Sequence, residues 1–167
     1  AISLFLSAKN KPFIACDIIA GFPGETDEDF KETLKLVNWA KFSWIHAFPF
    51  SPRPGTEAYS MKPKIPQSVA GKRVEQLLEI ATRNKIDYIK EFSGTAVSAI
   101  AEKSVQFEGK NCFRAVTENF LHCIVEPCGN VIPPQGSEIR IKIENPLETQ
   151  IASNQEEEAF AKLIRIY

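Results

Sequence analysis

The stretch DIIAGFPGETDEDF, residues 17–30, decides the fold, because it leads from a strand through a glycine-rich turn directly into a helix. Apolar residues run into the turn Gly21-Phe22-Pro23-Gly24, and Thr26 with Asp29 makes a capping-box-like helix start. The acidic residues 27–29 suit the positive end of the helix dipole. A strand, a turn and a helix N-terminus in this order commonly seat a small ligand.

The turn does not match the usual phosphate-binding patterns. It lacks the Lys-Ser/Thr pair of a P-loop, and it lacks the Gly-x-Gly-x-x-Gly spacing of a dinucleotide site. The motif alone is equally consistent with a strand-to-helix turn that needs glycine for its backbone angles and proline for rigidity.

The flanking segments read as alternating strand and helix. Residues 12–22 are nearly continuously apolar, which predicts a strand buried on both faces. Residues 26–40 have a helical period, and residues 43–50 form a second buried strand. This order predicts a parallel pair joined by a right-handed crossover. A lone strand histidine such as His46 is expected to be packed or hydrogen-bonded rather than catalytic.

A proline-rich loop, residues 51–66, precedes a predicted long helix over residues 68–92. Its apolar stripe consists of Ala70, Val74, Leu77, Ala81, Tyr88 and Phe92. Its outer face is expected to carry Lys72, Arg73, Arg83, Lys85 and Lys90.

After this helix the hydrophobic period becomes two, which is the pattern of a small β-barrel. The predicted strands are residues 95–102, 112–118, 121–127 and 138–144. Residues 150–158 are expected to form a loop, and the last nine residues fit a strand or a helix equally well.

Length and composition exclude several classes of protein. The 167 residues suffice for one domain or two small ones, and the formal net charge of −1 excludes a strongly basic nucleic-acid binder but not a locally basic one. No apolar run approaches the roughly 20 residues that span a bilayer. Four cysteines without a disulfide framework predict a cytoplasmic location.

The segment DIIAGFPGETDEDFKETLKLV (17–37), followed by FPFSPRPGTEAYSMKPKIP (48–66), a long helix and a small barrel, resembles the C-terminal part of the radical-S-adenosylmethionine methylthiotransferases. The resemblance extends to about residue 148. It implies an α/β part followed by an all-β part. Residues 1–66 would be the end of a partial (β/α)6 radical-SAM barrel, 67–92 a connecting helix, 93–150 an OB-like TRAM β-barrel, and 151–167 a C-terminal tail.

The resemblance also implies an activity. Members of this family add a methylthio group to an adenosine beside the tRNA anticodon, using S-adenosylmethionine and two 4Fe-4S clusters. The radical cluster needs a Cys-x-x-x-Cys-x-x-Cys run, which this sequence lacks. We therefore expect a fragment that is inactive alone, without catalytic residues, metal or bound cofactor, whose partner is the missing N-terminal part of the enzyme. Cys123 and Cys128 are expected to be buried apolar residues rather than metal ligands.

Candidate site residues follow from the same resemblance. Gly21 would let the adenosine of S-adenosylmethionine approach the backbone, and Phe22 would pack against the base. Glu25 would bond a backbone amide or a polar group of the ligand, or else only compensate the helix dipole.

The expected RNA contacts to the tRNA anticodon arm lie in two places. Arg53, between two prolines at the barrel mouth, suits a phosphate or base, although an exposed turn explains it equally well. Lys103, Lys110 and Arg114 bracket one hairpin, where Phe113 and Phe120 offer rings for stacking. Those rings fit a core, and those charges a solvated edge, just as well.

The resemblance favours one branch of the family and leaves alternatives open. The segments RPGT (53–56) and TENFLHCIVE (117–126) are similar to the branch that modifies threonylcarbamoyladenosine, with the isopentenyladenosine branch second. Residues 93–150 carry five Lys/Arg against seven Glu, which predicts weak unspecific RNA binding. A freestanding RNA-binding or adaptor protein, or a ribosomal-protein methylthiotransferase, remains open. Self-association through the two parallel strands is also expected.

Overall fold

The computed structural model describes residues 2–8, 10–129 and 131–167. The chain divides into two compact units, Ala1–Lys85 and Ile86–Tyr167. No helix in the described ranges is long and apolar enough to cross a membrane.

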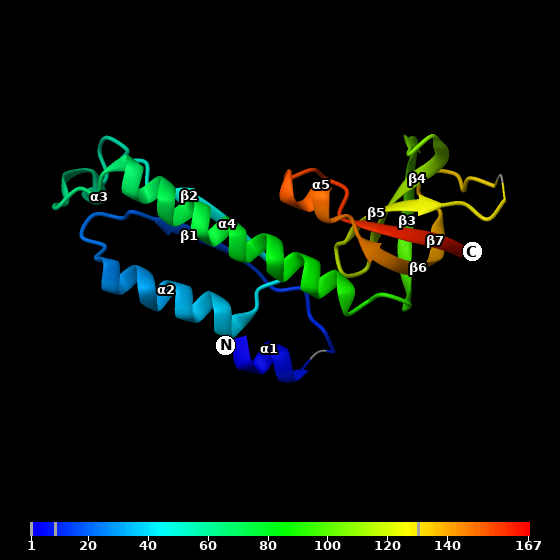
Figure 1. Ribbon diagram of the computed structural model, residues 1–167, viewed down its shortest axis with the longest axis horizontal. Helices are drawn as coiled ribbons and strands as arrows, with labels where there is room; N and C mark the ends of the chain where they lie inside the picture. Colours follow the sequence, from blue (N-terminus) through cyan, green and yellow to red (C-terminus); the bar gives the residue numbers. More distant parts are fainter. Residues whose placement is uncertain (1, 9, 130) are drawn as a thin grey trace. The chain divides into compact units, whose positions relative to one another are not determined.

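The first unit is a two-stranded parallel sheet with helices (Figure 1). Its elements are α1 (Ile2–Ala8), β1 (Ala15–Ala20), α2 (Asp27–Ala40), β2 (Trp44–Pro49), α3 (Glu57–Ser60) and the first part of α4 (Gln67–Lys90). The register of β1 and β2 runs from Ala15 opposite Trp44 to Ala20 opposite Pro49. The predicted parallel pair is therefore confirmed.

A capping box begins α2, as the sequence predicts. The backbone N–H of Asp29 donates to Thr26 Oγ1 over 3.1 Å, and the backbone N–H of Thr26 donates to Asp29 Oδ2 over 2.9 Å. These two bonds satisfy backbone donors that a helix N-terminus otherwise leaves without partners.

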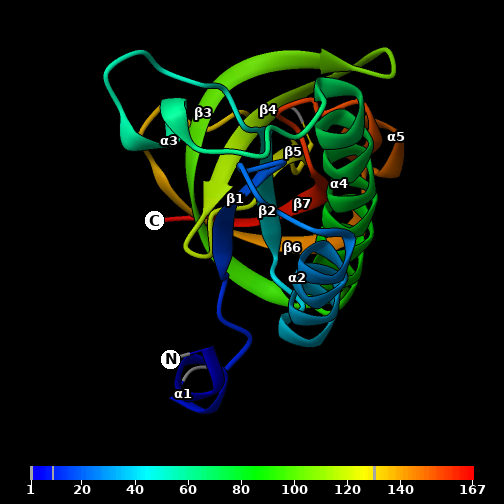
Figure 2. The same ribbon diagram turned by 90° about the vertical axis from the view of Figure 1, so that its left-hand side faces the viewer.

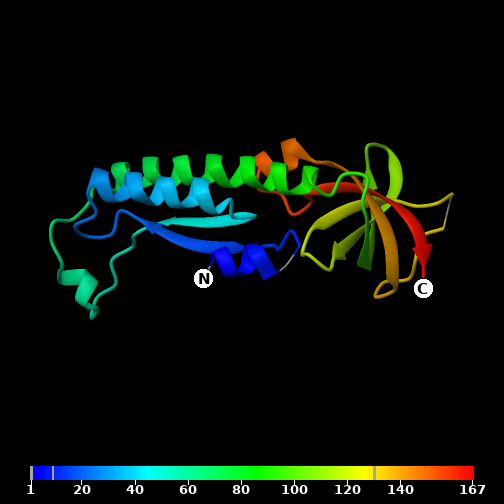
Figure 3. The ribbon, with the colours of Figure 1, turned by 90° about the horizontal axis from the view of Figure 1, so that it is seen from below.

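Both α2 and α4 lie along one face of the sheet (Figure 3). The apolar core formed by these helices and the sheet includes Phe30, Val37, Ile45, Leu77 and Ala81. On the strands, by contrast, Ile19 is 56% exposed and Phe48 is 51% exposed. The prediction that residues 12–22 are buried on both faces is wrong, because these helices cover only one face of the sheet.

The long helix α4 buries two charged residues that were expected on its outer face. Arg73 is 5% exposed and Lys85 is 2% exposed. Each lies three or four residues from a buried alanine, Ala70 or Ala81, and so shares the apolar face. The charged groups lie over aromatic rings: Arg73 over Phe30 at 5.3 Å, and Lys85 over Phe13 and Trp44 at 4.7 and 4.9 Å.

The second unit contains the predicted small β-barrel. Its strands are β3 (Ala96–Phe107), β4 (Lys110–Thr117), β5 (His122–Glu126), β6 (Glu138–Pro146) and β7 (Ala159–Ile166). They close in the order β3-β4-β5-β7-β6, and Figure 2 shows the strands curving around this ring. Only the β5–β7 pair among them is parallel. Buried inward residues include Phe113, Val125, Ile139, Ile141 and Ile143.

The end of the chain differs from expectation. Residues Glu148–Ala152 form α5, part of which was expected to be loop. The segment 151–167, interpreted as a tail, contributes β7 to the barrel between β5 and β6. Ala159, Ala161 and Leu163 point inward and are buried, so a strand period of two operates there.

Candidate cofactor-binding turn and nucleic-acid surface

The turn after β1 needs glycine for two reasons. Gly21 has a φ of 77°, and a Cβ built on it would lie 2.5 Å from Ala70 Cβ of α4. Gly24 also has a left-handed φ of 87°, but no atom of the described residues lies within 4 Å of its Cβ position. The side of Gly21 that lacks a Cβ therefore faces α4, and the turn is fastened against that helix.

A buried ion pair holds the same turn. Glu25 Oε2 accepts bonds from the backbone N–H of Gly21 and from Arg73 Nη1, both at 2.5 Å. Arg73 Nη2 also donates to Asp27 Oδ1 over 2.7 Å. Burial opposes the charge of Arg73, but the two carboxylates outweigh it and hold its pKa above the ordinary value.

Of the roles expected for Glu25, the structure realises the bond to a backbone amide. Sequence reasoning missed Arg73 as its partner. The signal that finds Arg73 is its spacing, three residues after Ala70 and four before Leu77, which puts an arginine on an apolar stripe.

An open apolar surface lies beside the turn. Phe22 is 40% exposed and packs edge-to-face on Phe50, with ring centroids 5.1 Å apart. The exposed Ile19 and Phe48 are cross-strand partners near the carboxyl ends of β1 and β2. Such a surface at the carboxyl ends of parallel strands suits a flat apolar ring of a ligand.

His46 belongs to β2 and is exposed. It accepts a hydrogen bond from Trp44 Nε1 over 3.3 Å and stacks on Phe48. It is a hydrogen-bonded residue, as the sequence predicts.

Arg53 is exposed in the loop between β2 and α3. Its backbone carbonyl accepts a bond from Thr56 Oγ1 over 2.8 Å, which folds the loop back at Gly55. The placement of Arg53 is compatible with both interpretations of this loop.

Two of the three basic residues on the β3–β4 hairpin are already paired. Lys110 Nζ bonds Glu126 Oε1 over 2.7 Å, and Arg114 Nη2 bonds Glu156 Oε2 over 2.5 Å and also contacts Glu157. The Arg114 side chain is only 16% exposed, so Arg114 does not lie on the solvated edge that the sequence allowed for these charges. Lys103 is exposed and makes no ion pair with any residue that the structure describes.

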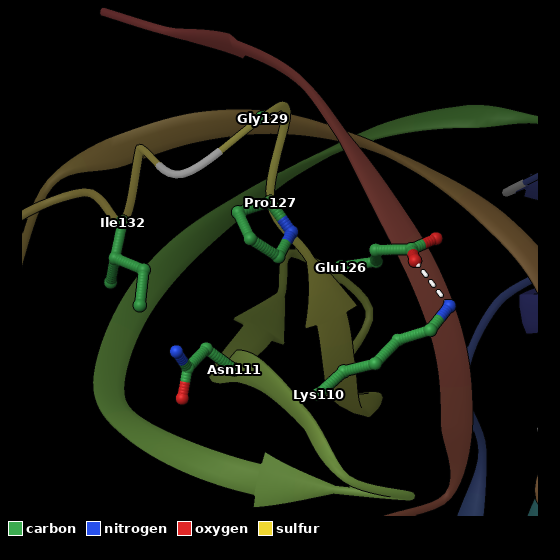
Figure 4. Close-up of a pocket in the computed structure, with 6 residues that line it drawn as sticks. All are labelled: Lys110, Asn111, Glu126, Pro127, Gly129 and Ile132. Atoms are coloured by element: carbon green, nitrogen blue, oxygen red, sulfur yellow. Dashed lines mark hydrogen bonds and ion pairs between the residues drawn. The ribbon is translucent and has the colours of Figure 1, made fainter.

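The Lys110–Glu126 pair borders a cavity of about 640 Å³ (Figure 4). Asn111, Pro127, Gly129 and Ile132 complete its lining. The hydrogen bond from Lys110 lowers the pKa of Glu126, so this carboxylate stays charged.

The structure distinguishes Phe113 from Phe120, for each of which the sequence allowed either a core position or a stacking role. Phe113 is fully buried in the barrel core. Phe120, in the turn between β4 and β5, is 68% exposed and has a φ of 61°. Of these two rings, that of Phe120 is the exposed one.

The cysteines do not form a cluster in the described part of the chain. Cys112 and Cys123 are buried, Cys16 is half-buried and Cys128 is exposed, which corrects the expectation of a buried Cys128. Burial raises the pKa of the Cys16, Cys112 and Cys123 thiols, which disfavours the thiolate that metals bind. No group of three metal-ligating side chains occurs among the described residues.

Comparison with known proteins shows that the chain is similar to part of the tRNA methylthiotransferases. It is 41% identical over 145 residues, 87% of its length, to a threonylcarbamoyladenosine tRNA methylthiotransferase MtaB of Treponema pallidum. It is 30% identical over 131 residues, 78% of its length, to the enzyme of the same name from Bacillus subtilis. A tRNA-2-methylthio-N(6)-dimethylallyladenosine synthase of Bdellovibrio bacteriovorus is 35% identical over 106 residues, 64% of the chain.

The matches cover 29%, 28% and 23% of these three relatives, so the chain spans less than a third of their length. No protein-family model matches the chain. The chain is nevertheless homologous, over nearly nine-tenths of its own length, to the C-terminal part of the tRNA methylthiotransferases.

Proposed function

We propose that this chain serves as the C-terminal part of a radical-SAM tRNA methylthiotransferase that adds a 2-methylthio group to a modified adenosine next to the anticodon. The observation that carries the proposal is the 41% identity over 145 residues to the Treponema pallidum threonylcarbamoyladenosine enzyme. Threonylcarbamoyladenosine is the proposed substrate, and dimethylallyladenosine is the second candidate, because a relative of that name also matches.

In this proposal the first unit ends a radical-SAM barrel and the five-stranded barrel is a TRAM domain. Gly21, Phe22 and Glu25 belong to the cofactor wall, and the exposed apolar surface at Phe22, Ile19 and Phe48 fits an adenine ring. Glu25 and Arg73 act by fixing the turn, since their charged groups bond each other and the Gly21 amide. S-adenosylmethionine would supply a radical, generated by a cluster that this sequence does not ligate.

The proposed RNA contacts differ in availability. Arg53, Lys103 and Phe120 are exposed, and neither Arg53 nor Lys103 forms an ion pair with a described residue. Lys110 and Arg114 must exchange a carboxylate partner for a phosphate. Lys110 and Arg114 therefore contribute less affinity than their charges alone predict.

A chimeric enzyme tests the proposal. The homologous part of the Treponema pallidum enzyme is replaced by this chain, and tRNA modified in cells lacking their own enzyme is hydrolysed and analysed by mass spectrometry. We expect 2-methylthio-threonylcarbamoyladenosine. A folded chimera with intact clusters that methylthiolates neither adenosine, while the parent enzyme does, contradicts the proposal.

A further inference from the structure

We infer that the outer surface of β6 and β7 is where the barrel meets the phosphate backbone of its RNA. This inference rests on the proposed function, since it locates the partner of the proposed TRAM domain. The surface is the basic strip formed by Arg140, Lys142, Lys162 and Arg165, none of which the sequence pattern singles out as an RNA contact.

The register of β6 and β7 brings these four residues together in two directly opposed pairs. Arg140 is the cross-strand partner of Arg165, and Lys142 is the partner of Lys162. The buried Ile141 pairs with the buried Leu163 between them, so the basic residues occupy the outward positions. Lys142, Lys162 and Arg165 are exposed, and Arg140 is half-buried.

Two like-charged pairs side by side do not help the barrel to fold. Directly opposite side chains on antiparallel strands lie about 5 Å apart at Cβ, and like charges at that distance are destabilising. Two other basic residues of the barrel are paired with acids, Lys110 with Glu126 and Arg114 with Glu156. The strip therefore needs an explanation outside the fold, and a polyanion removes the repulsion.

The carboxylates near the strip compensate only part of its charge. Lys142 Nζ forms an ion pair with Glu144 Oε1 at 3.4 Å. Glu126 is the cross-strand partner of Lys162, but its side chain already bonds Lys110. Glu138 lies two residues before Arg140 on the same strand and is exposed. Lys162 and Arg165 form no ion pair within the described ranges.

The two arginines of the strip contact neutral partners. Arg140 Nη1 donates to Ser98 Oγ over 3.0 Å, and Nη2 donates to the carbonyl of Ala96 over 2.9 Å. The guanidinium of Arg165 lies over the ring of Tyr167, 5.0 Å from its centroid, and this ring is 63% exposed. Neither contact neutralises charge, so both arginines remain available to an anion.

The dimensions suit a phosphate backbone. Outward residues on one strand are about 6.7 Å apart, and adjacent strands are about 4.8 Å apart. The four charges thus form a compact array rather than a single point. An array of this kind fits a chain that carries one negative charge per nucleotide, and its contribution to binding falls as salt rises.

The test compares two double variants of the 167-residue chain. Lys142→Gln/Lys162→Gln removes one opposed pair from the strip. The matched control, Lys31→Gln/Lys35→Gln, removes two exposed lysines from α2 and changes net charge equally. A fluorescent tRNA anticodon stem-loop is titrated at roughly 50 and 200 mM salt, a range over which electrostatic binding to nucleic acid falls steeply.

We expect the strip variant to bind roughly tenfold more weakly at the lower salt, and the slope of log affinity against log salt to flatten by about two. The control should keep the wild-type affinity and slope. The strip variant should melt at the same temperature as wild type or slightly higher, because a repulsive pair is gone.

The other outcomes are distinguishable. Equal, salt-dependent binding by wild type and the strip variant overturns the inference and leaves the proposed function standing. Failure of the wild-type chain to bind RNA overturns the inference even if the chimera is active, whereas failure of both overturns the proposed function as well. Competition by an acidic protein but not by RNA would assign the strip to a protein partner and overturn the inference.

Discussion

At the scale of single residues, Arg73 decides how firmly the turn after β1 is held. Its guanidinium bonds a carboxylate, Glu25, that is only 14% exposed. Replacing Arg73 with Met leaves that carboxylate buried without its partner. We expect the first unit to lose about 3 kcal/mol, the low end for a broken buried pair because Asp27 is exposed.

Tryptophan fluorescence during urea unfolding measures this loss, because both tryptophans, Trp39 and Trp44, belong to the first unit. Lys72→Met is the control, since Lys72 is the exposed neighbour of Arg73 on the same helix. Equal stability of the two variants would show that the buried pair contributes nothing.

The two glycines of the turn separate backbone strain from packing. Gly21→Ala and Gly24→Ala share a left-handed φ, which costs roughly 1–2 kcal/mol for a residue with a Cβ. Only Gly21→Ala also drives its Cβ into Ala70. We expect Gly21→Ala to unfold at clearly lower urea than Gly24→Ala, and Ala70→Gly to recover part of the difference in the double variant. Additive effects of the two substitutions would argue against the contact.

Phe120 and Phe113 should behave oppositely. Phe120→Ala is expected to weaken binding of an anticodon stem-loop by about 1–3 kcal/mol, the range for a stacked base, and to lower the melting temperature less than Phe113→Ala does. Phe113→Ala is expected to cost about 3–5 kcal/mol of stability, because its ring fills the barrel core. Unchanged RNA affinity in Phe120→Ala would remove that ring from the proposed contacts.

At the scale of elements, the N-terminus of α2 has a measurable pH dependence. Hydrogen bonds from the backbone and then the side chain of Thr26 lower the pKa of Asp29. Since the folded-state pKa lies below the unfolded one, this stabilisation is complete above the unfolded pKa and is lost as pH falls through the folded pKa. Between roughly pH 5 and pH 2 the wild type should therefore lose more stability than Asp29→Asn.

Thr26→Ala should cost about 1 kcal/mol at neutral pH, and Thr26→Ser should cost much less, because serine keeps the capping oxygen. Tryptophan fluorescence reports both. Parallel pH profiles for wild type and Asp29→Asn would exclude a contribution from the capping box.

Elements whose determinants are local could be predicted from the sequence. The helix cap at Thr26 and Asp29 and the glycine turn each depend on residues a few positions apart in the sequence. The alternation of buried and exposed residues in β3 to β6 is likewise visible within each strand. The ion pair of Glu25 with Arg73 spans 48 positions, and the sequence marks only that Arg73 lies on an apolar stripe. Strand β7 remained ambiguous because its place between β5 and β6 is set by partners that are distant in sequence.

The candidate binding surfaces also contain some features that follow from local sequence and others that depend on residues distant in the chain. The position of Gly21 and Phe22 at the end of a strand follows from their local pattern. The neutralisation of Arg114 by Glu156 and Glu157 does not, because those acids are 42 and 43 residues away in the chain. The basic strip likewise exists only through the register of β6 and β7.

At the scale of the whole molecule, the two units differ in how well they cover their own strands. The barrel pairs every one of its strands on both sides. The first unit has a two-stranded sheet, with Ile19 and Phe48 side by side on an exposed face. Open parallel edges and exposed apolar side chains favour pairing with another chain.

We therefore expect the 167-residue chain to self-associate through its first unit, while the barrel remains as it is in the monomer. Sedimentation velocity should show association that rises with concentration, and Ile19→Lys/Phe48→Lys should reduce it. The matched variant Leu36→Lys/Trp39→Lys places the same charges at exposed apolar positions on α2 and should have less effect. Hydrogen exchange should be slower in β3 to β7 than in β1 and β2, because a closed barrel has no free edge to open from. A strictly monomeric chain with slow exchange throughout residues 12–50 would show that the uncovered face is stable by itself and needs no partner.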